Sequence, residues 1–219
     1  YKIIAVMKNE FATLSQRKII QAMNWAYDKA VNGIPGLDSA EELAACYLKK
    51  EGSLKEQIDS LIRWQNTKAG TSGFVTGLGG ILTMPATLPA NITSVLYIQI
   101  RMIAAIAKMC GFDVRDDKVR TLVYVCLVGS SSSEFIKDIG IQFGGKIAIS
   151  AIKKIPRAVI TKINQAVGFR LLTKFGEKGL INLGKTVPLL GGLFGGAFDA
   201  ISTNTVGNTA RNLFMNSIK

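Results

Sequence analysis

The sequence contains no histidine, and this absence excludes several kinds of chemistry at once. A Ser-His or Cys-His nucleophile pair, a histidine base and a histidine-ligated zinc cannot be built within this chain. Only three cysteines occur among 219 residues, at positions 46, 110 and 126, and none belongs to a CxxC pattern. Such a sparse, odd set argues against a disulfide framework and suits a reducing compartment. We therefore expect a protein that is not an enzyme and that uses no metal or other cofactor.

Acidic residues are also few, because 15 Asp and Glu stand against 27 Lys and Arg, for a formal net charge of +12. Residues 1–136 carry a net charge of +3, whereas residues 137–219 carry +9. With 48% apolar residues and a mean hydropathy of +0.26, the chain is too hydrophobic to be disordered. Its length suits one folded domain, and its basic excess lies in the C-terminal part.

Alternating strand patterns are scarce, and apolar residues recur at helical spacing instead. The first helix is predicted to begin at Ser15 as N-cap, and another after the capping box of Ser39 and Glu42. A long helix predicted over residues 89–109 ends at Gly111. We predict an all-α protein, a single compact multi-helix domain of about eight or nine helices with glycine-rich helix contacts. In this domain an N-terminal helical part, residues 1–65, packs with a core, residues 66–219.

Residues 69–100 form a run of 32 residues without a formal charge. A membrane-spanning helix needs about 20 predominantly apolar residues, so the run is long enough. However, it contains several glycines and is broken by Pro85 and Pro89. We therefore predict a buried hairpin of two short helices over residues 70–90. A hairpin that enters lipid on membrane contact is the alternative.

Glycines four residues apart recur in the apolar segments, as in Gly73 and Gly77. Small residues at this spacing let a second helix approach closely. Two isolated charges, Arg101 and Asp199, lie in apolar helices and are expected to approach each other, because an unpaired buried charge is costly. The residues to which we assign structural or packing roles are Gly73, Gly77, Gly80, Pro85, Pro89, Arg101, Gly111, Asp113, Pro188, Gly191, Gly192, Gly195, Gly196 and Asp199.

The most informative feature is a basic amphipathic region in which cations alternate with Ile, Val, Leu and Phe. Such a helix can rest on anionic headgroups with its apolar side buried in lipid. The alternative is a core helix with a solvated basic face. The candidate lipid-binding or membrane-binding residues are Lys146, Lys153, Lys154, Arg157, Lys162, Arg170, Lys174 and Lys178.

Two other anion-binding interpretations are weaker. Residues 179–186 match the phosphate-loop pattern GxxxxGK[ST], but no strand precedes them and Pro188 follows closely, so we do not predict nucleotide binding. We do not expect nucleic acid as a partner, because only Phe143, Phe169 and Phe175 accompany the basic region as aromatic platforms.

Three segments resemble the EcsC family. Residues 73–89 are similar to its glycine-rich signature. Residues 100–113 resemble an arginine, an alanine-rich helix and a Gly-Tyr/Phe-Asp corner, although Cys110 stands where the family tends to have an aromatic residue. Residues 187–197 look like its C-terminal Pro-Gly-Gly element. The family is named for the third protein of a bacterial ABC-transporter operon, and the resemblance implies a bacterial, intracellular, membrane-associated protein without adding catalytic residues.

We therefore expect a non-enzymatic bacterial protein, cytoplasmic and peripheral to the inner membrane, that associates with anionic membrane or binds a lipid. One alternative is an adaptor that docks on a membrane transporter or another protein. Another is a membrane-inserting effector or toxin. The basic region would supply the attraction, and the glycine-rich apolar helices would supply the apolar contact.

Overall fold

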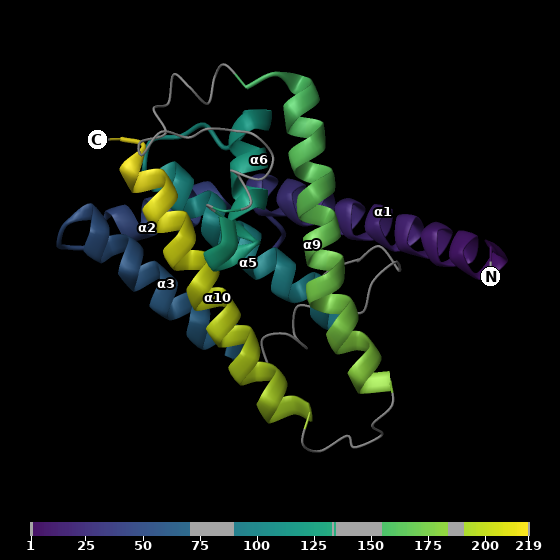
Figure 1. Ribbon diagram of the computed structural model, residues 1–219. Coiled ribbons are helices and arrows are strands. Elements are labelled where there is room, and N and C mark those ends of the chain that lie inside the picture. Colours follow the sequence, from purple (N-terminus) through teal and green to yellow (C-terminus); the bar gives the residue numbers. More distant parts are fainter. Residues whose placement is uncertain (1, 71–89, 133, 135–154, 184–190, 219) are drawn as a thin grey trace.

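The computed structural model describes residues 2–70, 90–132, 134, 155–183 and 191–218 (Figure 1). These residues form seven α-helices and one 3-10 helix and contain no strand. The all-α prediction is confirmed, and the α-helices of this described part of the chain are slightly fewer than the eight or nine predicted. The elements are α1 (Lys2–Asn32), α2 (Ala40–Leu48), α3 (Leu54–Gly70), α5 (Ala90–Met109), α6 (Asp117–Cys126), η1 (Gly129–Ser131), α9 (Arg157–Leu183) and α10 (Gly191–Asn216).

Helix α5 forms the centre of the molecule, and α1, α2, α3, α6 and α10 all pack on it (Figure 1). Every residue from Thr93 to Ala107 is buried, so α5 has no face in water over that stretch. This agrees with its sequence, in which Arg101 and Lys108 are the only formal charges. A helix that is apolar all round is stable in water only when other helices surround it.

Short-range signals set several helix ends as the sequence predicts. The capping box at α2 is confirmed: Ser39 Oγ accepts from the Glu42 N–H at 3.2 Å, and Glu42 Oε2 accepts from the Ser39 N–H at 2.8 Å. Gly111, with φ of +84°, ends α5, and the N–H of Phe112 reaches back to the carbonyl of Ala107. The polar corner that follows Gly111 holds Asp116, the N-cap of α6.

The predicted start of the first helix is wrong, because α1 begins at Lys2 and Ser15 lies inside it. Residues 2–14 contain neither glycine nor proline, so nothing in them stops a helix that continues upstream. The N-terminal part of α1 projects past α9 (Figure 1). Another predicted element, the hairpin over residues 70–90, lies outside the described residues except at its ends.

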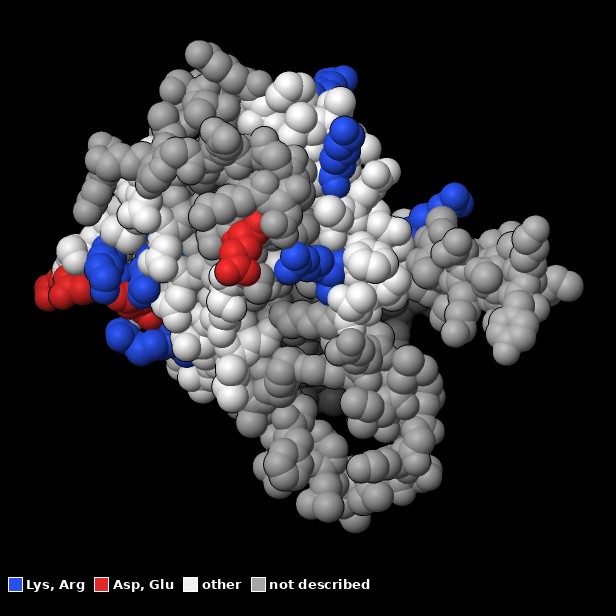
Figure 2. Space-filling model, viewed as in Figure 1, with Lys and Arg blue, Asp and Glu red and all other residues white. Residues whose placement is uncertain are grey.

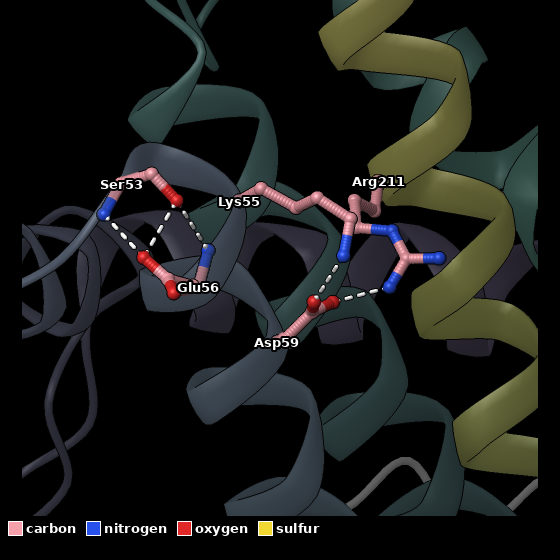
Figure 3. Close-up of polar contacts among 5 residues, drawn as sticks. All are labelled: Ser53, Lys55, Glu56, Asp59 and Arg211. Atoms are coloured by element: carbon pink, nitrogen blue, oxygen red, sulfur yellow. Dashed lines mark hydrogen bonds and ion pairs between the residues drawn. The ribbon is translucent and has the colours of Figure 1, made fainter.

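Helices α3 and α10 run side by side (Figure 1) and are joined by charges as well as by apolar contacts. The carboxylate of Asp59 in α3 lies between Lys55 of the same helix and Arg211 of α10 (Figure 3). The Lys55 ammonium donates at 2.8 Å, and the Arg211 guanidinium donates to the other carboxylate oxygen. At the start of α3, Ser53 and Glu56 form a second reciprocal cap (Figure 3). Of these contacts, the one between Asp59 and Arg211 joins α3 to α10.

Candidate functional site

The basic side chains predicted to bind lipid lie on α9 as far as the structure describes them. Arg157, Lys162 and Arg170 are all exposed. The backbones of Lys174 and Lys178 belong to the same helix, but their side chains are not among those described. Lys146, Lys153 and Lys154 lie outside the described residues. Figure 2 shows Lys and Arg side chains spaced along the α9 side of the molecule, with uncharged residues between them.

The apolar face of α9 is covered by protein. Ile163, Val167 and Leu171, each one turn from the next, are buried where α9 packs on α1 and α6. At Gly168 the approach to α1 is so close that an added Cβ would stand 2.8 Å from Cγ1 of Ile20. Over this stretch α9 is thus a core helix with a solvated basic face, and these three residues are not available to lipid in this conformation.

The outer face of α9 nevertheless carries an apolar side chain. Phe169 is 53% exposed and lies seven residues, or two helical turns, after Lys162 and next to Arg170. We call Lys162, Phe169 and Arg170 the outer surface of α9. An exposed aromatic ring flanked by cations is the arrangement found where helices rest at a membrane interface.

A groove of about 780 Å³ separates the first turns of α9 from α1 and α6, and Arg157, Thr161 and Asn164 line its α9 side. Its opposite wall holds Arg120 of α6 and Asn24 of α1. The side-chain oxygen of Asn164 is buried and has no hydrogen-bond partner among the described residues. The groove is therefore polar, with Arg157 as the cation on its α9 side, whereas Asp116 and Asp117 offset Lys118 and Arg120 on the opposite wall.

Arg120 is held in place from several directions. Its Nε donates to the Tyr124 hydroxyl at 2.9 Å, its Nη2 donates to Asn24 Oδ1 at 3.1 Å, and it pairs with Asp28 at 3.3 Å. The guanidinium also lies 4.8 Å from the ring centroid of Tyr27. Burial raises the pKa of Tyr27, and it raises the pKa of Tyr124 to about 12. Both phenols therefore stay protonated, and the cluster joins α6 to α1.

Arg101 is the most unusual residue of the described core, because it is a charged residue that is only 2% exposed. Its Nη1 donates to the backbone carbonyl of Asp38 at 3.1 Å, in the loop between α1 and α2, and its Cζ lies 5.4 Å from the ring centroid of Tyr97. No sequence pattern indicated the contact between Arg101 and Asp38. The side chain of the predicted partner, Asp199, is not described, so the pairing of Arg101 with Asp199 stays a prediction.

The other predicted packing residues fall into two groups. Gly111 and Asp113 form the corner after α5, where the Asp113 carboxylate accepts from the Arg115 N–H at 2.9 Å. No side chain stands within 4 Å of a Cβ built at Gly111, so its role is its left-handed conformation and not close packing. The glycines at 191, 192, 195 and 196 lie in the first turns of α10. The packing of these turns is outside what the structure describes. Gly73, Gly77, Gly80, Pro85, Pro89 and Pro188 lie outside the described residues.

Among the glycines whose contacts the structure describes, those at which two helices approach most closely were missed. They are Gly168 and Gly207, and at Gly207 an added Cβ would stand 2.9 Å from Ile62 and 3.1 Å from Met102. Neither glycine belongs to a pair four residues apart, so the spacing pattern could not find them. In the phosphate-loop match, Gly179 and the residues up to Leu183 lie in α9 and do not form a loop.

The described residues offer little for covalent or metal chemistry. They contain no group of three or more Asp, Glu or Cys side chains that could hold a metal ion. Cys46 is exposed, whereas Cys110 and Cys126 are buried. Burial raises the pKa of Cys110 to about 11 and raises that of Cys126 as well, so both are held as thiols. Among the described helices, none combines the length and the apolar character needed to cross a bilayer.

The fold and surface together define an all-α protein with a solvated basic helix and charged groups in its core. A model of the EcsC protein family matches residues 2–216, and the chain therefore belongs to that family. The match extends beyond the three segments that carry the resemblance and includes the N-terminal helices. Comparisons with curated proteins and with solved structures each found no match to this chain.

Proposed function

We propose that this protein attaches peripherally to anionic membrane through the outer surface of α9, or holds a lipid, and acts without catalysing a reaction. The observation that carries the proposal is the exposed ring of Phe169 between Lys162 and Arg170, on a helix whose other face is fixed in the core. The net charge of +12 supports it, because a positive protein is drawn to anionic headgroups.

The buried side of α9 defines how this attachment works. Because Ile163, Val167 and Leu171 pack on α1 and α6, α9 contributes its outer surface and does not sink its main apolar face into lipid. Electrostatic attraction then supplies most of the binding free energy, and Phe169 adds a single apolar anchor. Binding of this kind weakens as salt screens the charges.

The test is flotation with vesicles of phosphatidylcholine, with and without phosphatidylglycerol, at low and high salt. We expect binding only to the anionic vesicles, and loss of binding at high salt. Lys162→Glu removes one attraction of about 1 kcal/mol and adds a similar repulsion, so binding should fall about 30-fold at low salt. Lys29→Glu, at an exposed position of α1, makes the same change in net charge and is the matched control.

The apolar anchor is tested separately. Phe169→Ala should weaken binding to anionic vesicles, whereas Leu48→Ala, which removes an apolar side chain of similar exposure from α2, should not. Equal losses for Lys162→Glu and Lys29→Glu would show that net charge acts without a defined surface. The absence of binding to any vesicle would overturn attachment through the outer surface of α9 and favour an enclosed lipid or an adaptor for a transporter or another protein. Release of trapped dye would instead favour the inserting effector.

A further inference from the structure

Helix α3 also carries a large exposed aromatic side chain. Trp64 is 53% exposed, the same fraction as Phe169 of α9. Arg63 precedes it, and the ammonium of Lys68, one turn later, lies 5.5 Å from its ring centroid. A tryptophan ring combines an apolar body with a polar N–H, and such rings are common where proteins meet a membrane interface. The surroundings of Trp64 therefore resemble those of Phe169, because each ring is exposed and has cations beside it.

A pocket of about 240 Å³ opens beside Trp64, between the end of α2 and α3. It is lined by Tyr47, Lys50, Ser60, Arg63, Trp64 and Thr67. These described lining residues include two cations and three hydroxyl groups, and none of them is acidic. A concave surface lined by charge of one sign attracts a ligand of the opposite sign. The charge of the pocket therefore favours an anionic group.

Lys50 is held over the pocket by two contacts. Its ammonium lies 3.9 Å from the ring centroid of Tyr47 and 3.5 Å from Ser60 Oγ, at the limit of a hydrogen bond. An ammonium has three N–H donors, so at least two remain for a ligand. Arg63 adds a guanidinium, whose planar set of donors matches phosphate oxygens. The pocket therefore suits the phosphate of a lipid headgroup, with the ring of Trp64 beside it in the interface.

This pocket and the outer surface of α9 lie on opposite sides of the molecule. Helix α3 contacts α10 through Asp59, Ile62 and Asn66. Trp64 is two residues from Ile62 and from Asn66, or about 200° around the helix, so it points away from α10. In the view of Figure 1, α10 and α5 lie between α3 and α9. A flat membrane that contacts one of these surfaces therefore does not reach the other.

We propose that Lys50, Arg63 and Trp64, which we call the α2–α3 surface, contact a second anionic membrane, so that one molecule bridges two bilayers. This inference rests on the proposed function, since the outer surface of α9 supplies the first contact. The second contact is the weaker one, because residues 1–136 carry a net charge of +3 against +9 for residues 137–219, and Glu51 follows Lys50. Molecules gathered on one vesicle present this weaker contact many times to the next vesicle, so it acts through avidity.

Dynamic light scattering tests the bridging with the same phosphatidylcholine and phosphatidylglycerol vesicles as the flotation. The protein should cluster these vesicles at low salt, and high salt should disperse them. Arg63→Glu and Trp64→Ala should each slow clustering about tenfold and leave flotation nearly unchanged, because the outer surface of α9 is intact. The matched controls are Lys29→Glu, with the same change in net charge, and Ile201→Ala, which removes an exposed apolar side chain from α10. Both should cluster vesicles as the unchanged protein does.

Fluorescence reports directly whether Trp64 enters lipid. Emission should shift to shorter wavelength with anionic vesicles, and Trp64→Phe, which retains Trp25, should lose this shift. Flotation without clustering and without the shift would overturn the inference, leave the proposed function intact and favour a protein partner for Trp64. Clustering that persists in Arg63→Glu and Trp64→Ala would show that net charge alone joins the vesicles, and it would overturn the inference too. Failure to float with any vesicle would overturn both proposals.

Discussion

Gly207 lies where α3, α5 and α10 meet, and even one methyl group there would collide with its neighbours. A Cβ would stand 2.9 Å from Cγ1 of Ile62 and 3.1 Å from Cε of Met102. The Met102 terminus can move, but Ile62 is a buried β-branched side chain with restricted rotamers. The contact distance therefore favours a loss of stability over the usual gain of replacing a helical glycine.

We expect Gly207→Ala to lower the free energy of unfolding by up to about 2 kcal/mol. Overpacking costs about 1–3 kcal/mol, and the better helix propensity of alanine returns about 1 kcal/mol. Urea unfolding followed by circular dichroism measures the difference. The control is Asn212→Ala at an exposed position of the same helix, which should be neutral or slightly stabilising. A stabilised Gly207→Ala variant would show that the three helices are not in such close contact.

The raised pKa values of the buried tyrosines lead to a second prediction at the scale of residues. Burial raises the pKa of Tyr27, Tyr47, Tyr97 and Tyr124 above their ordinary value of about 10. Because the folded pKa is the higher one, the stability that these phenols contribute is full below about pH 10 and is lost as pH rises toward the folded values. Absorbance at 295 nm during an alkaline titration should therefore rise together with the loss of helical circular dichroism. Normal ionisation of these phenols near pH 10 in the folded protein would contradict this.

At the scale of helices, the contact between α3 and α10 depends on Asp59. Burial alone would raise the pKa of Asp59, but hydrogen bonds from Lys55 and Arg211 outweigh it and lower the pKa. The folded pKa is thus below the unfolded value of about 3.9, so this stabilisation is present above pH 4 and is lost as pH falls through the folded pKa. Asp59→Asn should lower the free energy of unfolding by about 1 kcal/mol at pH 7, and by progressively less below pH 4.

A double-mutant cycle with Arg211→Gln isolates the pair, and Glu51→Gln, at an exposed position, is the control for loss of one negative charge. The coupling between Asp59 and Arg211 should appear at neutral pH and fade under acid conditions. Additive effects at pH 7 would mean that the ion pair does not stabilise the packing of α3 on α10.

The helix ends show what the sequence can determine. The Ser39–Glu42 box and the Gly111 turn were predicted because each depends on residues within one turn of the helix end. The start of α1 was not, because Ser15 has the chemistry of a cap but no helix-stopping residue precedes it. An N-cap signal is informative only where the helix has a reason to begin there.

Contacts between distant helices could not be predicted in the same way. The amphipathic pattern of α9 fits a lipid surface and a protein core equally well, and the packing of α9 on α1 and α6 decides that Val167 and its neighbours are buried. The Asp38 carbonyl that accepts from Arg101 lies 63 residues away in a loop without any charge pattern. Gly168 and Gly207 stand out only once their partners, Ile20 and Ile62, are known.

At the scale of the whole molecule, the three cysteines report whether the protein keeps its fold on a membrane. Cys46 is exposed on α2, whereas Cys110 and Cys126 are buried at the end of α5 and the end of α6. The thiolate is the reactive form, and burial both blocks access and raises the pKa of the two internal thiols. Thiol reagents should therefore modify one cysteine per native chain and three per denatured chain.

If the protein attaches by the outer surface of α9, α5 and α6 stay packed. The reagent should then still modify one cysteine per chain when anionic vesicles are present. Insertion of the apolar interior into lipid would require the helices around α5 to separate, and this would expose Cys110 and Cys126 to the reagent. The Cys46→Ser variant gives the sharper form of the test, because it should show no modification with or without vesicles. Vesicle-dependent modification of that variant would contradict surface attachment and support an inserting protein, because only a rearranged core can present these two thiols.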